Sequence, residues 1–324
     1  MQHYKHARKS PSQSHYESFG IYGGKRHRLL LSALAAFTAG FLLLVSCGKK
    51  SVAFTPDERK TVDSIVCSVS TPDSLALLQK QFESKGDMLG SVVALRELGK
   101  ALRNDSRFEE ALRTHSEGLR QAESIGDTLE WVQALNNIGT DYRRMGVLDA
   151  AQEYHYSAWK LSEECADTSF TAKKNRVVSL NGLGNIYMTL GNYKRADRAL
   201  RMALKGEQQL NSALGQAINY ANLGSIFEYW GQTDSAWVYY RKSMALNTEA
   251  GSDLGISLCH TYFGSLYQKA GQYDKATGEY ETAYQMMQAS KDEWHALNTL
   301  IALAGIYHAT GNHTKGLEYL DRAK

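Results

Sequence analysis

Apolar residues recur every three or four positions along most of the chain, and short polar turns interrupt them. In residues 179–204, Leu180, Leu183 and Tyr187 share one side of a helix. Gly191 breaks this pattern, and a second helical pattern begins directly after it. The stretch therefore predicts two helices joined by a tight turn.

This two-helix pattern repeats along the chain. A glycine inside the first helix and an alanine inside the second recur at steps of 40, 45, 40, 40 and 40 residues, by subtraction. A glycine inside a helix costs about 1 kcal/mol relative to alanine, and it is tolerated where a neighbouring helix must come close. The first set is Gly99, Gly139, Gly184, Gly224, Gly264 and Ala304. The second set is Ala111, Ala151, Ala196, Ala236, Ala276 and Gly316. The turn positions are Ser106, Gly146, Gly191, Gly231, Gly271 and Gly311.

These residues resemble the tetratricopeptide repeat, which has Leu-Gly and an aromatic residue in its first helix and two alanines in its second. The spacing exceeds the usual period of about 34 residues. It is similar to the extended repeats of kinesin light chains and of peptide-sensing bacterial regulators. The resemblance implies an all-α, right-handed superhelical solenoid of about six repeats over residues 88–324. A degenerate capping repeat is expected at 56–87, because a terminal repeat has one face in solvent.

The first 46 residues have a different composition. Residues 1–28 are polar and basic, and residues 29–46 form a run of 18 residues without a charge. The run ends in Leu44-Val45-Ser46-Cys47, which resembles the lipobox of bacterial lipoproteins. This resemblance implies a signal peptide over 1–46, lipidation of Cys47 and a short tether over 47–55. An uncleaved membrane anchor is the alternative, since 18 residues can just span a bilayer. Either interpretation places the rest of the chain in the cell envelope, and the lipoprotein would face the periplasm.

Removing the leader changes the charge balance. The leader holds six of the 37 basic residues and one of the 34 acidic residues, so the remainder has 31 and 33, about −2. Such a near-neutral chain offers no electrostatic footprint for nucleic acid. His115 and His155 occupy the same place in two repeats, which indicates a packing position. We find no phosphate-binding loop, zinc motif or nucleophile elbow, and we expect neither catalysis, nor a cofactor, nor a bound metal.

We expect binding residues on the first helix of each repeat, which lines the inner groove of such a solenoid. An asparagine side chain both donates and accepts hydrogen bonds, so a ladder of asparagines can hold a peptide backbone. Arginine and lysine at the N-terminal end would bind a carboxylate. The alternative is that these residues are solvated helix faces. The predicted groove residues are Arg96, Lys100, Arg103, Asn136, Asn137, Arg143, Asn181, Asn185 and Asn222.

These observations favour a non-catalytic, lipid-anchored scaffold that binds a peptide or protein segment. The repeat pattern stops inside a second helix, so we expect the natural chain to continue beyond residue 324. The alternative function is therefore the extracytoplasmic sensory half of a signalling or transcription regulator whose output domain lies beyond that point. A transmembrane run downstream would favour the sensor.

Overall fold

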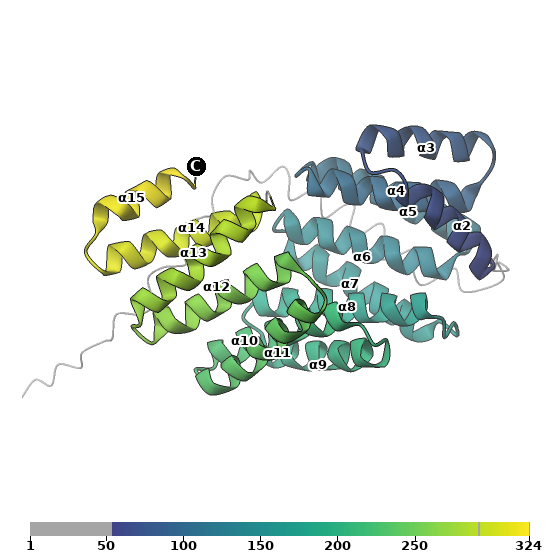
Figure 1. Cartoon of the computed structure of the whole chain (residues 1–324). Coiled ribbons are helices and arrows are strands. Elements are labelled where there is room, and N and C mark those ends of the chain that lie inside the picture. Colours follow the sequence, from purple (N-terminus) through teal and green to yellow (C-terminus); the bar gives the residue numbers. More distant parts are fainter. Residues whose placement is uncertain (1–53, 291, 324) are drawn as a thin grey trace, which may run out of the picture. The chain divides into compact units, whose positions relative to one another are not determined.

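The computed structural model describes residues 54–290 and 292–323, all of which belong to the second of the two compact units of the chain, 50–324 (Figure 1). The predicted signal peptide, the predicted lipidation of Cys47 and nearly all of the predicted tether lie outside the described residues. The described part consists of fourteen α-helices. They are α2 (Pro56–Cys67), α3 (Pro72–Ser84), α4 (Met88–Asn104), α5 (Phe108–Ile125), α6 (Thr128–Arg144), α7 (Leu148–Glu164), α8 (Phe170–Thr189), α9 (Tyr193–Gln209), α10 (Ala213–Tyr229), α11 (Thr233–Glu249), α12 (Asp253–Lys269), α13 (Tyr273–Ala289), α14 (Glu293–Ala309) and α15 (His313–Asp321).

From α4 onward the helices form six hairpins, and the first and second helix of each are here called the A helix and the B helix. Each B helix packs on its own A helix, and the first five B helices also pack on the A helix of the next hairpin. Successive A helices also contact each other directly. The predicted all-α solenoid of helix-turn-helix repeats is therefore confirmed. In residues 54–290 and 292–323, no helix has the length and apolar character that crossing a bilayer requires.

The turn inside each hairpin uses a left-handed backbone. The five turn glycines have φ between 71° and 83°, a region that glycine enters at little cost because it has no Cβ. In the first hairpin Ser106 takes this place with φ 60°, although a non-glycine residue is strained there.

In the first five hairpins, the glycine inside the A helix makes room for a large side chain of its own B helix. A Cβ on Gly224 would lie 2.6 Å from the ring of Tyr240, and one on Gly139 would lie 2.8 Å from the ring of His155. The repeated alanine of the B helix, such as Ala236, is fully buried beside the same seam. The seam thus pairs a glycine on one helix with a bulky residue on the other.

The first two helices depart from this arrangement. Thr55 and Glu58 form a reciprocal capping box at the start of α2, as the Thr-Pro-Asp-Glu sequence indicates. Both α2 and α3 pack on α4, but they make little contact with each other. Val62 and Val66 of α2 share one cluster with Leu75 of α3 and with apolar residues of α4.

Candidate functional site on the A helices

All the predicted groove residues belong to A helices, whose common surface is here called the A face. Its N-terminal cations are paired within the chain. Arg96 donates to Asp63 of α2 at 2.7 Å and to Glu130 of α6 at 2.8 Å. Arg96 and Lys100 both donate to Glu97 at 2.8 Å. Arg96 therefore links α2, α4 and α6, whereas Lys100 pairs within α4.

Burial makes this cluster electrostatically costly unless it is paired. Burial alone would lower the pKa of Arg96, but the carboxylates of Glu130 and Glu97 raise that pKa above its ordinary value. Burial raises the pKa of Glu130, and the nearby charge of Asp127 raises it further. Removing one member of such a cluster leaves a buried charge without compensation, so the pairing is obligatory.

Arg103 is also occupied. It donates to the Asp141 carboxylate at 2.9 Å and to the side chain of Asn137 at 3.2 Å. The other oxygen of Asp141 lies 2.5 Å from Nδ1 of His115. Asp141 is fully buried, so the predicted binding residues Arg103 and Asn137 instead stabilise the junction between α4 and α6.

Asn136 was expected in the groove, but only 4% of it is exposed. Its Oδ1 atom lies 3.0 Å from Nδ1 of His155, and its Nδ2 donates to the carbonyl of Asn175 in α8 at 3.3 Å. These contacts place the Asn136 side chain between α7 and α8. Asn136 therefore connects two hairpins and is not available to a partner.

The asparagines of α8 and α10 form a row across two neighbouring A helices, as predicted for a ladder. Asn181, Asn185 and Asn222 are each partly exposed, and Asn222 Nδ2 donates to Asn185 Oδ1 at 3.0 Å. This bond leaves Asn185 with its amide donors and Asn222 with its carbonyl acceptor. Oδ1 of Asn181 is buried and accepts no hydrogen bond from a described residue. The ladder thus joins two neighbouring A helices and retains hydrogen-bonding capacity.

Arg143 lies at the C-terminal end of α6 and is partly buried. Burial lowers its pKa, and the charges of Arg144 and Arg103 lower it further. Among the described residues, no carboxylate forms an ion pair with Arg143. Of the predicted groove cations, this one keeps a charge that the described chain does not neutralise.

An exposed apolar row on the A face was not predicted from the sequence. Val178 of α8 and Ile218 of α10 are 38% and 55% exposed, and they occupy the same place in successive repeats. Leu214 and Leu254, also 40 residues apart, are 46% and 45% exposed. Ile218 precedes Asn222 by four residues, so both share one side of α10. The sequence did contain a sign of this row, because apolar residues recur at 40-residue steps at positions that are not the repeated glycine, alanine or aromatic positions.

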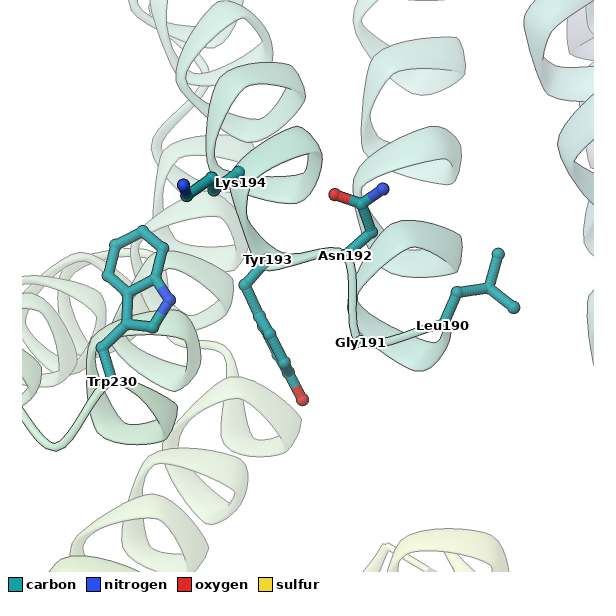
Figure 2. Close-up of a pocket in the computed structure, with 6 residues that line it drawn as sticks. All are labelled: Leu190, Gly191, Asn192, Tyr193, Lys194 and Trp230. Carbon is teal, nitrogen blue, oxygen red and sulfur yellow. The ribbon is translucent and has the colours of Figure 1, made fainter.

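A second, shallower feature lies at the turn edge of the solenoid. Figure 2 shows an open pocket there, with the indole of Trp230 beside Tyr193 and Lys194. Tyr193 also stacks on Tyr229, with 3.6 Å between the ring centroids. This pocket lies at the hairpin turn, away from the Asn185–Asn222 pair. Among residues 54–290 and 292–323, no group of three or more His, Cys, Asp or Glu side chains is arranged to hold a metal ion.

Similarity to known proteins agrees with this architecture. The tetratricopeptide repeat model matches residues 131–164 and 176–209, which begin in α6 and α8 and end in α7 and α9. No curated protein matches the chain.

Several crystal structures share the fold at low sequence identity. A Rap protein complexed with competence and sporulation factor is 14% identical, with a TM-score of 0.58 over 92% of this chain and 93% of that one. Aspartyl phosphate phosphatase F from Bacillus subtilis is 13% identical, with a TM-score of 0.54 over 75% and 72%. A chain of the APC/C hetero-tetramer Cut9–Hcn1 is 15% identical, with a TM-score of 0.59 over 90% and 49%. The chain thus contains two stretches that match the tetratricopeptide repeat, and it shares the solenoid fold of these neighbours.

Proposed function

We propose that the chain is a non-catalytic scaffold that binds an extended peptide or protein segment along the A face of α8, α10 and α12. The observation that carries this proposal is the position of the Asn185–Asn222 amide pair beside an exposed apolar row. A monomeric surface rarely exposes such residues together without a binding role.

The two features suit different parts of an extended ligand. Free amide donors and acceptors bind the backbone whatever its sequence. The apolar row, which includes Ile218 and Leu254, binds alternate side chains of the same segment through burial of apolar area. The Rap protein complexed with competence and sporulation factor has a similar fold, which supports a peptide-sized or protein partner for this scaffold.

We further propose that Cys47 carries a lipid that tethers the scaffold to the cell envelope on the periplasmic side. The support is the leader sequence, with its basic start, its 18 uncharged residues and its Ser46-Cys47 junction. Metabolic labelling with a palmitate analogue tests this directly. Label on the wild-type chain and none on Cys47→Ser is the expected result, and equal labelling of both would contradict it.

The binding proposal is tested by crosslinking the full chain to its partners in isolated envelopes. Ile218→Asp with Leu254→Asp places two charges in the apolar row, and the crosslinked partner should fall at least tenfold. The matched control is Val238→Asp on the B helix α11, where Val238 is 50% exposed. The control should leave the partner unchanged. If the row variant crosslinks as well as the control, binding on this surface is wrong.

A further inference from the structure

The first described helix, α2, does not occupy the place of a regular A helix. It makes little contact with α3, and Figure 1 shows it running obliquely to α3. It contacts α4, and beyond α4 the side chain of Arg59 reaches the start of α6. There Arg59 forms an ion pair with Asp127, and its other guanidinium nitrogen lies 3.7 Å from Glu130. Thus α2 packs on α4, and Arg59 joins it to the start of α6.

One side of α2 makes all these contacts. Arg59 and Asp63 are four residues apart and therefore neighbours on the helix surface. Asp63 accepts a hydrogen bond from Arg96 at 2.7 Å. Val62 and Val66 are the buried residues of α2. The contact side is thus a short amphipathic pattern of a cation, a carboxylate one turn later, and two valines.

The attachment of α2 is slight compared with that of the later helices. It has 12 residues, a length at which an isolated helix is marginal in water. Ile65 is 44% exposed, and the Asp63 side chain is 49% exposed. Segments with few buried apolar contacts open locally at lower free energy than the core. We therefore expect α2 to detach before the hairpins unfold.

Detachment of α2 would uncover the surface of α4 and α6 that it contacts. Arg96 would keep its bonds to Glu130 and Glu97, but Asp127 and Glu130 would lose Arg59. The side chains of Asp127 and Glu130 are only 1% and 4% exposed in the present arrangement. Asp127 would lose its ion pair with Arg59 and Glu130 would keep the one with Arg96, so the uncovered surface would carry excess negative charge. The vacated surface therefore selects a replacement cation.

We propose that the A face of α4 and α6 is a binding site for a short amphipathic helix. In the free protein α2 occupies this site, and a partner helix can displace it. A competing partner helix would present a basic residue in the place of Arg59 and a carboxylate in the place of Asp63. Two apolar residues would replace Val62 and Val66. This site is separate from the row on α8, α10 and α12, so the inference does not rest on the proposed function.

The test uses the full chain with Arg59→Glu and Asp63→Lys, followed by hydrogen exchange. The amides of α2 should exchange at least tenfold faster than in wild type, while the amides of α6 to α13 keep their protection. A fluorescent synthetic peptide of residues 54–70, with Ser in place of Cys67, should bind this variant at least tenfold more tightly than it binds wild type. A peptide carrying the same two charge exchanges is the control and should not bind.

Two results would overturn the inference. One is that wild-type α2 amides exchange only as slowly as those of α6, so that α2 opens only by global unfolding. The other is that the peptide fails to bind a variant whose α6 to α13 remain protected. Should the double variant unfold, Asp63→Asn replaces it, and unchanged protection of α2 in that variant would equally contradict the proposal.

Discussion

In the hairpins α4–α5 and α6–α7, the ring that fills the glycine seam is an imidazole, from His115 and His155. In α10–α11 and α12–α13 it is a phenol, from Tyr240 and Tyr280. His115 reaches inward to a fully buried carboxylate, Asp141, at 2.5 Å. The Tyr240 hydroxyl instead donates at 2.6 Å to Glu228, whose other oxygen pairs with the exposed Lys269 at 2.8 Å.

The same scaffold position therefore supports two kinds of A face. In the N-terminal half, the polar side chains of Arg96, Arg103 and Asn136 form hydrogen bonds to the next A helix. They hold the repeats together and are not available to a partner. In the C-terminal half, aromatic packing stabilises the hairpins, and the A face keeps exposed residues such as Ile218 and Leu254. A helix face is free to bind a partner only where other contacts already hold the helices.

The largest expected effect comes from the buried carboxylate of the N-terminal half. Asp141→Ala leaves Arg103 and His115 without their shared partner. Breaking a buried ion pair by removing one side costs about 3–5 kcal/mol, so the free energy of unfolding should fall by about that amount in urea titrations. Glu228→Ala, in the more exposed C-terminal network, serves as the comparison and should cost clearly less. Equal losses would remove the contrast between the halves.

A somewhat smaller effect is expected for the seam itself. Gly224→Leu places a side chain against the buried ring of Tyr240, and such overpacking costs about 1–3 kcal/mol. Gly278 of α13 is the control, because a Cβ there would meet nothing within 4 Å. Gly278→Ala should stabilise the chain by up to about 1 kcal/mol through helix propensity. The melting temperatures of both variants are compared with that of wild type. A Gly224→Leu protein that melts at the wild-type temperature would show that the seam is not tightly packed.

The imidazole seam should give the N-terminal half a pH dependence that the phenol seam lacks. Burial, with the charges of Arg143 and Arg103, lowers the pKa of His155 to about 3 from 6.5. The unfolded state therefore takes up a proton first. The stability due to neutral His155 is complete above pH 6.5 and is lost as the pH falls toward 3, by at most about 1.4 kcal/mol per pH unit. His155→Leu, which copies Leu200 of the third hairpin, should flatten the stability profile over this range. A profile as steep as that of wild type would contradict the assignment.

The smallest effect concerns the turns. Ser106 adopts φ 60° where the other hairpins have glycine. Ser106→Gly should raise stability by up to about 1 kcal/mol, because it removes the left-handed strain, partly offset by the entropy of the unfolded chain. Gly146→Ser in the next hairpin is the reciprocal variant and should lower stability by a similar amount. Melting temperatures that move in the same direction would count against this explanation.

The sequence alone determined the repeat. Glycine and alanine at 40-residue steps predicted the hairpins, and the turn glycines predicted their left-handed ends, because these requirements are local to one helix pair. The sequence also placed His115 and His155 at a packing position, and both are 1% exposed. It placed Asn185 and Asn222 among the groove asparagines, and in the structure the two side chains are hydrogen-bonded.

Only the tertiary structure decided which A-face residues are available. Asn136 and Asn181 occupy the same repeat position, yet Asn136 is buried and Asn181 is partly exposed. The difference depends on how closely each A helix packs on the next, since α6 contacts α8 more extensively than α8 contacts α10, and a repeat pattern does not encode this spacing. The position of α2 could not be predicted from the sequence either, because its ion pairs join residues that are 33 and 68 positions apart. Contacts of that range follow from the stacking of hairpins, and the stacking sets which charges of the A face remain free.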